Sequence, residues 1–295
     1  ISVFAEPRKI VDLDESVEGL LKAFPDLGML ELRKRLNSGA GFTWIKRIAT
    51  PDQQKQLLAL GIPGIGFRSE TRRVYPNGST AAHLLGAVNV DNVGIAGIEK
   101  WIDGQGLNDL KQAGLQFESS DLAPVALSID LRVQYAVTAE LTKAVKKFGA
   151  IAGAGLVLDV TSGEIIALVS LPDFDPNTPG DALKLDRINR INVGTYEMGS
   201  TFKAMTTALA LESGLYNLNS VIDASQPLRF GRMAIRDYHG KNRPLKVPEA
   251  FVYSSNIAMG RMALGVGTER HQAFLKSLGQ FDRLVTELPE SSQPI

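Results

Sequence analysis

The sequence predicts an α+β fold, and three features of the chain support this prediction. Residues 131–148 have the apolar spacing of a helix, and two β-rich runs follow at 156–160 and 165–171. The four residues 161–164 that join these runs suit a β-hairpin. Further helical patterns come after the hairpin, which indicates helices packed on an antiparallel sheet and not a parallel βαβ array.

The length of the chain predicts two domains. With 295 residues it is near the size at which a single hydrophobic core splits. The segment ESSDLAP, at 118–124, is polar, lacks periodicity and ends in proline. We therefore place the boundary there, with an N-terminal domain at 1–122 and a second domain at 123–295.

The first domain is expected to contain short, mixed elements. Residues 14–24 and 27–37 have helical apolar spacing, and Thr50 is a suitable N-cap for a third helix. The run GIPGIGF, at 61–67, lacks the span and the lysine of a phosphate-binding loop, so we expect a turn leading into a strand. The glycine-rich stretch 71–103 then indicates short elements joined by tight turns.

The helix expected at 131–148 has one apolar stripe. Its members recur at every fourth position and end three residues further on: Val133, Val137, Leu141, Val145 and Phe148. Asp130 is expected to cap its start and Gly149 its end.

Composition excludes several classes of function. Lysine plus arginine equals aspartate plus glutamate at 32 each, so we expect no nucleic-acid partner. The chain has no cysteine, which removes thiolate catalysis and cysteine-bound zinc. The three histidines, at 83, 239 and 271, are scattered and lack metal-binding spacing, so we expect neither a metal nor another cofactor.

The stretch TYEMGSTFKAM, at 195–205, carries the first candidate site. Helical spacing begins at Ser200 and stops at Gly214, so we expect Ser200 at a helix N-terminus, where the helix dipole favours developing negative charge. Lys203 lies three residues later on the same face, where desolvation can make its amine a base for the Ser200 hydroxyl. Gly199 leaves room for a substrate to approach closely.

A second pattern changes how the first one is interpreted. Taken alone, S-x-x-K is more often a serine that caps a helix beside a solvated lysine. The stretch AFVYSSNIAMG, however, contains Ser254 and Asn256 in an S-x-N arrangement, which accompanies S-x-x-K in serine acyl-transfer enzymes that react with penicillin. A Ser-His-Asp hydrolase would instead require a second glycine where Phe202 stands.

At these motifs the chain resembles the class B penicillin-binding proteins, and the resemblance covers nearly all of it. YEMGSTFK and SSN resemble the first two motifs of the family, and residues 155–177 resemble its hairpin and following loop. The R-x-Y-P run at 73–76 and GIAGIE at 94–99 resemble its N-terminal pedestal. The resemblance thus implies a pedestal domain at 1–122 and a C-terminally truncated transpeptidase domain, similar to β-lactamases, at 123–295. Division-specific members are the most similar, and elongation-specific members come second.

The resemblance also implies roles for the motif residues. Ser200 would attack the D-Ala-D-Ala bond of a peptidoglycan stem peptide, Lys203 would act as base, and Ser254 would relay a proton. Asn256 and Gly199 would contribute to substrate binding. β-Lactams would acylate Ser200.

The resemblance further implies a cellular context. The implied partners are stem peptides, a lipid-linked precursor and other division-complex proteins. The parent protein would be anchored in the bacterial inner membrane by a segment absent here and would act on its periplasmic side.

Two observations leave alternatives open. The K-T-G motif of the family does not occur in the sequence, which we interpret as truncation before that motif. A non-catalytic scaffold or wall-binding protein would retain the motifs only as structure. The presence of both a serine at 200 and a lysine at 203 favours the enzyme, because a scaffold requires neither.

Overall fold

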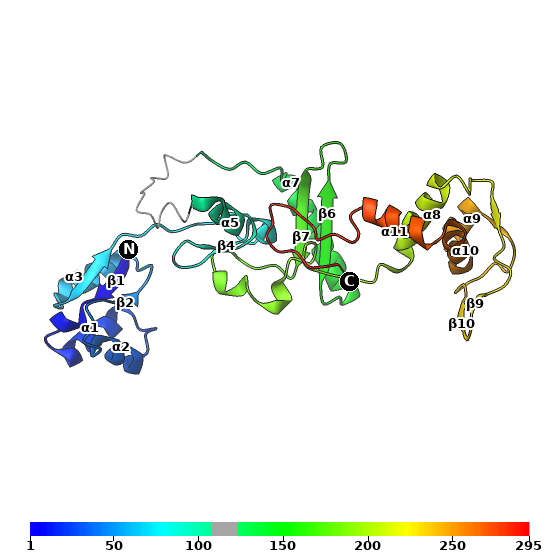
Figure 1. The fold of residues 1–295 in the computed structure, drawn as a ribbon. Helices are drawn as coiled ribbons and strands as arrows, with labels where there is room; N and C mark the ends of the chain where they lie inside the picture. The colour runs from blue at the N-terminus through cyan, green and yellow to red at the C-terminus, as the bar shows by residue number, and fades with distance from the viewer. Residues whose placement is uncertain (108–122, 295) are drawn as a thin grey trace. The chain divides into compact units, whose positions relative to one another are not determined.

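The computed structural model describes residues 1–107 and 123–294 (Figure 1). The chain divides into two compact units, one formed by residues 1–78 and 88–95 and the other by 79–87 and 96–295. The predicted domain boundary rests on a segment of which residues 118–122 lie outside the described residues. It therefore stays a prediction.

The first unit is a three-stranded antiparallel sheet with helices. Strand β1 (Ser2–Ala5) lies between β2 (Thr43–Lys46) and β3 (Ile65–Arg68). Its helices are α1 (Leu13–Ala23), α2 (Met29–Leu36) and α3 (Pro51–Leu60), and the short 3-10 turn η1 (Pro7–Lys9) follows β1. These elements confirm the three helices predicted in this region and the turn leading into a strand at GIPGIGF, where the strand begins at Ile65 within the run.

Local sequence determines where these helices begin. Asp12 accepts a hydrogen bond from the Glu15 amide at the start of α1. Thr50 and Gln53 form a reciprocal capping box at the start of α3, as the N-cap prediction requires. The core beneath the sheet is continuous and apolar, and its fully buried members include Val3, Ala5, Leu20 and Phe24.

Short elements connect the first unit to the second. They are α4 (Ala82–Leu85), the paired strands β4 (Ala87–Val88) and β5 (Gly94–Ala96), α5 (Gly97–Ile102) and the π-turn η2 (Asp103–Leu107). Leu84 and Ile98 from these elements are buried with Leu168 and Leu288 in one small core.

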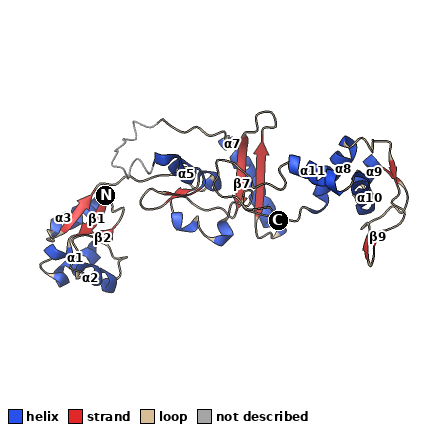
Figure 2. Ribbon diagram, viewed as in Figure 1, coloured by secondary structure: helices blue, strands red, loops and turns tan. Residues whose placement is uncertain are grey.

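The second unit contains the predicted helix and hairpin. Helix α7 (Leu131–Phe148) packs on the antiparallel strands β6 (Gly153–Leu158) and β7 (Ile165–Leu171) (Figure 2). Asp130 caps the helix by accepting hydrogen bonds from the Arg132 and Val133 amides, and Gly149 ends it in the left-handed conformation. The cap predictions are confirmed, and the hairpin forms as an antiparallel pair.

The first hairpin strand begins earlier than the predicted residue 156. Gly153 and Gly155 belong to β6 because the helix lies directly above them. A Cβ atom on Gly153 would be 2.9 Å from Val145, and one on Gly155 would be 3.0 Å from Val137. The glycines therefore permit close helix packing, and the predicted stripe of α7 faces the hairpin. Phe148 is an exception, because it is 75% exposed.

A buried glutamine fixes α7 to the outer edge of β7. The Gln134 amide donates to the Leu168 carbonyl and accepts from the Leu168 amide, both at 2.8 Å. Gln134 is only 2% exposed, and its two hydrogen bonds satisfy backbone groups of Leu168 that a neighbouring strand would otherwise bond.

The remaining elements lead to and surround the candidate site. After the 3-10 turns η4 (Pro179–Asp181), η5 (Leu185–Arg187) and η6 (Gly199–Phe202) come α8 (Lys203–Glu212) and β8 (Val221–Ile222). The hairpin of β9 (Leu228–Phe230) and β10 (Met233–Ile235) follows, and β11 (Leu245–Lys246) pairs with β8. Helices α9 (Val247–Val252), α10 (Asn256–Val266) and α11 (Thr268–Ser277) complete the series.

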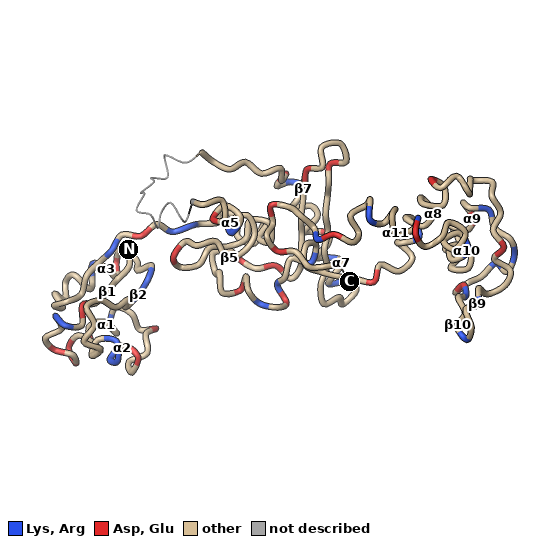
Figure 3. The backbone as a smooth tube through the Cα atoms, viewed as in Figure 1, with Lys and Arg blue, Asp and Glu red and all other residues tan. Residues whose placement is uncertain are grey.

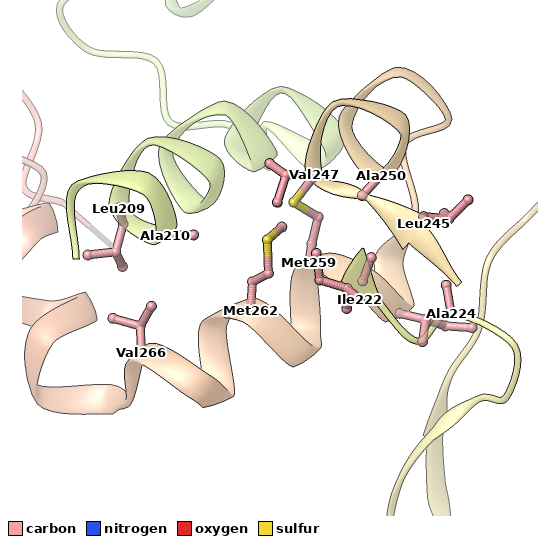
Figure 4. Close-up of a cluster of buried hydrophobic side chains, with 12 residues drawn as sticks. Leu209, Ala210, Ile222, Ala224, Leu245, Val247, Ala250, Met259, Met262 and Val266 are labelled. Carbon is pink, nitrogen blue, oxygen red and sulfur yellow. The ribbon is translucent and has the colours of Figure 1, made fainter. Parts of the chain in front are cut away.

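A third apolar core holds these helices together. Met259 and Met262 of α10 are buried with Leu209 and Ala210 of α8 and with Val247 of α9 (Figure 4). This core fixes the two helices that carry the S-x-x-K and S-x-N motifs. Charged residues of both signs are distributed along the rest of the chain (Figure 3). Among the described residues, none of the helices combines the length and apolar character that a membrane crossing needs.

Candidate active site

Ser200 lies in a tight turn directly before helix α8. The turn η6 (Gly199–Phe202) has 3-10 geometry, and the α-helix itself begins at Lys203, three residues later than predicted. The Ser200 carbonyl accepts a hydrogen bond from the Lys203 amide, so the serine still belongs to the first turn of the helical segment. Ser200 is exposed.

The structure brings Ser200, Lys203 and Ser254 together through one chain of hydrogen bonds. The Lys203 amine donates to the Ser254 hydroxyl at 2.8 Å and to the Ser254 carbonyl at 2.6 Å. The Ser254 hydroxyl in turn donates to the Ser200 hydroxyl at 3.1 Å. Within the described residues, the Lys203 amine bonds to Ser254 and not directly to Ser200. The direct contact expected from the i, i+3 spacing is thus replaced by a relay through Ser254.

Ser254 adopts a backbone conformation that is uncommon for serine. Its φ is 53°, in the left-handed region where glycine is favoured. The cause is the end of helix α9, where the Ser254 amide bonds to the Phe251 carbonyl and the Ser255 amide bonds to the Ala250 carbonyl. These two bonds form a Schellman motif, whose left-handed position is usually glycine. A serine at this position therefore costs about 1 kcal/mol and places a hydroxyl between Lys203 and Ser200.

The next residue, Ser255, starts helix α10 and anchors the motif. It is 1% exposed, and its hydroxyl accepts a hydrogen bond from the Ala258 amide. It also donates to the Asp237 carboxylate at 2.8 Å, and the same carboxylate accepts from the Ile257 amide at 3.0 Å. Asp237 therefore holds the segment on both sides of Asn256.

Sequence reasoning did not identify Ser255 or Asp237. For Ser255 a signal existed, because a serine directly before an apolar helical run is a typical N-cap. For Asp237 the sequence contains no local signal, since its partners are about 20 positions away.

The Asn256 side chain bonds to the neighbouring hairpin and not to the hydroxyl relay. Its side-chain amide donates to the Arg236 carbonyl at 2.8 Å, which connects the motif to the end of β10. The amide oxygen has no hydrogen bond within the described part of the chain. The role of Asn256 in substrate binding stays a prediction.

Gly199 has a conformational role that the sequence did not predict. Its φ is 55°, and a Cβ atom there would meet nothing within 4 Å. The left-handed backbone requires glycine here, and the space beside it is open. Its role in substrate approach stays a prediction.

The environment of Lys203 lowers the pKa of its amine. Burial lowers the pKa of the Lys203 amine below the ordinary 10.5, while the negative charge of Asp237 acts in the opposite direction. A larger fraction of this lysine is therefore uncharged at a given pH than for a solvated lysine. A neutral amine next to two hydroxyls can accept a proton, which is the requirement for a general base.

The histidines lie apart from this relay. His83 is buried, bonds to the Arg187 carbonyl at 2.8 Å and packs against Phe174, and burial lowers its pKa. His239 packs against the neighbouring Tyr238 ring. Among residues 1–107 and 123–294, no three histidines or carboxylates gather in a way that could hold a metal ion.

An exposed serine hydroxyl, bonded through a second serine to a lysine with a lowered pKa, is an arrangement that can support serine acyl transfer, and it lies on an α+β fold. Residues 153–293 match the family of the penicillin-binding protein transpeptidase domain. The chain as a whole is similar to penicillin-binding proteins.

Within this family, the similar curated proteins include transpeptidases named FtsI. The chain is 36% identical to a probable peptidoglycan D,D-transpeptidase FtsI of Caulobacter vibrioides over 100% of this chain and 48% of the relative. It is 32% identical to peptidoglycan D,D-transpeptidase FtsI of Escherichia coli over 90% of this chain and 48% of the relative. The chain thus spans about half the length of these relatives.

Solved structures support the same fold. Penicillin-binding protein 3 of Mycobacterium tuberculosis has a TM-score of 0.66 at 26% identity, over 75% of this chain and 50% of the other. A peptidoglycan synthetase of Bifidobacterium adolescentis also has a TM-score of 0.66, at 21% identity, over 99% of this chain and 60% of the other. The predicted α+β class and the resemblance to penicillin-binding proteins are confirmed.

Proposed function

We propose that this chain carries the nucleophilic part of a peptidoglycan D,D-transpeptidase of the class B, FtsI type. The observation that supports it is the continuous chain of hydrogen bonds from Lys203 through Ser254 to Ser200. If Ser200 only capped a helix and Lys203 were only a solvated side chain, no serine in a left-handed conformation would be needed between them.

The geometry suggests the following acylation step. The Ser200 oxygen attacks the carbonyl between two terminal D-alanines, and its proton passes through the Ser254 hydroxyl to the neutral Lys203 amine. A hydroxyl can accept and donate at once, so Ser254 serves both neighbours. The carbon–nitrogen bond then breaks, and the same relay returns the proton to the amine of the departing D-alanine.

Deacylation completes the transfer. The amine of a second peptidoglycan strand attacks the Ser200 ester and forms the new peptide bond, and its proton returns to Ser200. Gly199 and Asn256 contribute to substrate binding beside the relay. A β-lactam that resembles the D-Ala-D-Ala end acylates the same serine and blocks the site.

The names of the relatives support a cellular role for the whole protein. FtsI-type similarity favours septal wall synthesis on the periplasmic side of the inner membrane, with the protein anchored in that membrane. Its partners in this proposal are stem peptides, the lipid-linked precursor and other division-complex proteins.

Mass spectrometry after incubation with a penicillin tests the proposal. The full-length gene product should gain the mass of the opened β-lactam on the peptide that contains Ser200. Adducts confined to other peptides, or none at all, would contradict the assigned nucleophile.

A further inference from the structure

We propose that the β9–β10 hairpin is a second substrate contact, which binds carboxylate groups of the stem peptide through Arg229 and Arg232. This inference rests on the proposed function, because it extends the same active site beyond the reacting bond.

The segment from β9 to β11 is strongly basic, although the chain as a whole has no net charge. Residues 228–246 contain six lysines and arginines and one carboxylate, whereas the whole chain has 32 charges of each sign. The six cations are Arg229, Arg232, Arg236, Lys241, Arg243 and Lys246. Figure 3 shows basic positions on the hairpin and on the loop that follows it.

Two of the basic residues after the hairpin have partners within the fold, whereas the arginines of the hairpin itself do not. Arg243 forms an ion pair with Glu249, and Lys241 lies 4.7 Å from the ring centre of Tyr253. Arg229 and Arg232 are exposed, and neither has an ion pair or a hydrogen bond from its side chain within the described residues. The one carboxylate, Asp237, is already bonded to Ser255 and Ile257. The two arginines therefore lack a counter-charge.

The hairpin is anchored at its base, next to the candidate site. Leu228 pairs with Ile235 across the strands, and both side chains reach Gly260 of α10, where a Cβ atom would lie 3.0 Å from Leu228 and 3.7 Å from Ile235. The Arg236 carbonyl accepts the Asn256 amide at 2.8 Å. The hairpin thus starts at the S-x-N motif and projects from it.

The two faces of the hairpin differ in character. Side chains alternate along a strand, so Arg229 and its partner Ala234 share the face opposite to Leu228 and Ile235. Arg232 lies in the turn between the strands. Arg229 therefore lies on the face opposite to α10, and Arg232 lies in the turn. The packing of the hairpin against α10 holds both positions in place.

The dimensions suit a short extended peptide. Four residues separate Arg236 at the motif from Arg232 in the turn, which is about 13 Å at 3.3 Å per residue. When the D-Ala-D-Ala end of a stem peptide reacts at Ser200, the residues before that end span a similar length. An extended chain covers about 3.3–3.6 Å per residue. An extended acidic peptide bound there would place carboxylates beside the two arginines, and arginine pairs with a carboxylate through two parallel hydrogen bonds.

A steady-state kinetic comparison tests the proposal on the full-length gene product. The variant is Arg229→Gln/Arg232→Gln, and the matched control is Lys146→Gln/Lys147→Gln at the exposed end of α7, which removes the same charge. The substrates are a synthetic acidic peptide ending in D-Ala-D-Ala and the same peptide with its side-chain carboxylates amidated. Penicillin acylation and the melting temperature are measured in parallel.

The expected result separates binding from chemistry. KM for the acidic peptide should rise about three- to tenfold in the hairpin variant, because exposed ion pairs are individually weak. The kcat value, the KM of the amidated peptide and the rate of penicillin acylation should not change. Added salt should raise KM for wild type more than for the variant.

Other outcomes would overturn the proposal. An unchanged KM for the acidic peptide, or an equal rise for the amidated peptide, would show that the arginines do not bind carboxylates. Slower penicillin acylation in the hairpin variant would mean that the hairpin acts on the site geometry instead. Binding of anionic lipid vesicles that the variant loses, with KM unchanged, would assign the arginines to a membrane surface. Failure of wild type to react with penicillin would instead refute the proposed function.

Discussion

The hydroxyls of Ser200 and Ser254 lie 3.1 Å apart, but the two serines are held in different ways. Ser200 is exposed in a short turn, and local features position it: a glycine with φ of 55° before it and a helix after it. Ser254 lies between two helices, in a conformation that serine adopts at a cost, and is followed by a buried serine bound to Asp237. The proposed nucleophile is thus placed locally, whereas the proposed relay depends on tertiary contacts.

The largest expected effect is loss of the locally placed nucleophile. Ser200→Ala should abolish penicillin labelling and leave the melting temperature close to wild type, because Ser200 is exposed and packs against little. Labelling is measured on gels with a fluorescent penicillin. Persistent labelling of this variant would contradict Ser200 as the nucleophile, and Ser254 would then have no nucleophile to serve as a relay.

Removal of the base should have the next largest effect. Lys203→Met should slow acylation about 10²- to 10⁴-fold, the usual range for a general base. In wild type the rate should rise with pH as the Lys203 ammonium loses its proton. The rate should level off at a pH below 10.5, because burial lowers the pKa of this amine.

Stopped-flow acylation of both proteins between pH 5 and pH 10 would check these expectations. A wild-type rate that does not rise with pH, or a variant with the wild-type profile, would exclude Lys203 as the base.

A pair of variants at Ser254 separates its conformational cost from its chemistry. Ser254→Ala and Ser254→Gly both lose the relay hydroxyl, so both should slow acylation about a hundredfold. Only glycine relieves the left-handed backbone, so Ser254→Gly should be the more stable by about 1 kcal/mol. Thermal denaturation monitored by circular dichroism measures this difference. Equal stabilities would show that the turn stores no strain.

The smallest expected effect comes from Asp237, the tertiary anchor of the relay. Asp237→Asn should slow acylation about tenfold, because the neutral amide holds Ser255 and the Ile257 amide less firmly. The charge of Asp237 raises the pKa of Lys203, so the rising part of the pH profile should move to lower pH in this variant.

The matched control is Asp223→Asn, which changes a carboxylate bonded to Ser225 in an exposed turn. It should alter neither the acylation rate nor the pH profile. A slower Asp237→Asn enzyme with an unmoved pH profile would limit Asp237 to a structural role.

Much of the fold follows from local patterns that the sequence displays directly. The caps of α3 and α7 and the apolar stripe facing β6 depend on residues close together in the chain. The early start of β6 was not predictable in this way. Gly153 and Gly155 are unfavourable in an isolated strand, and only the helix above them explains their presence.

For the candidate site, the sequence by itself determined the chemical groups and their helices. The S-x-x-K and S-x-N patterns identify a serine, a lysine and a second serine because spacing along a helix follows from its 3.6-residue period. Only the tertiary structure decided their connection, with Ser254 between Lys203 and Ser200. Ser254 is more than 50 positions from both Lys203 and Ser200 in the chain. The packed core of α8, α9 and α10, the Schellman end of α9 and the Asp237 anchor bring them within hydrogen-bonding distance, and no local pattern encodes such long-range contacts.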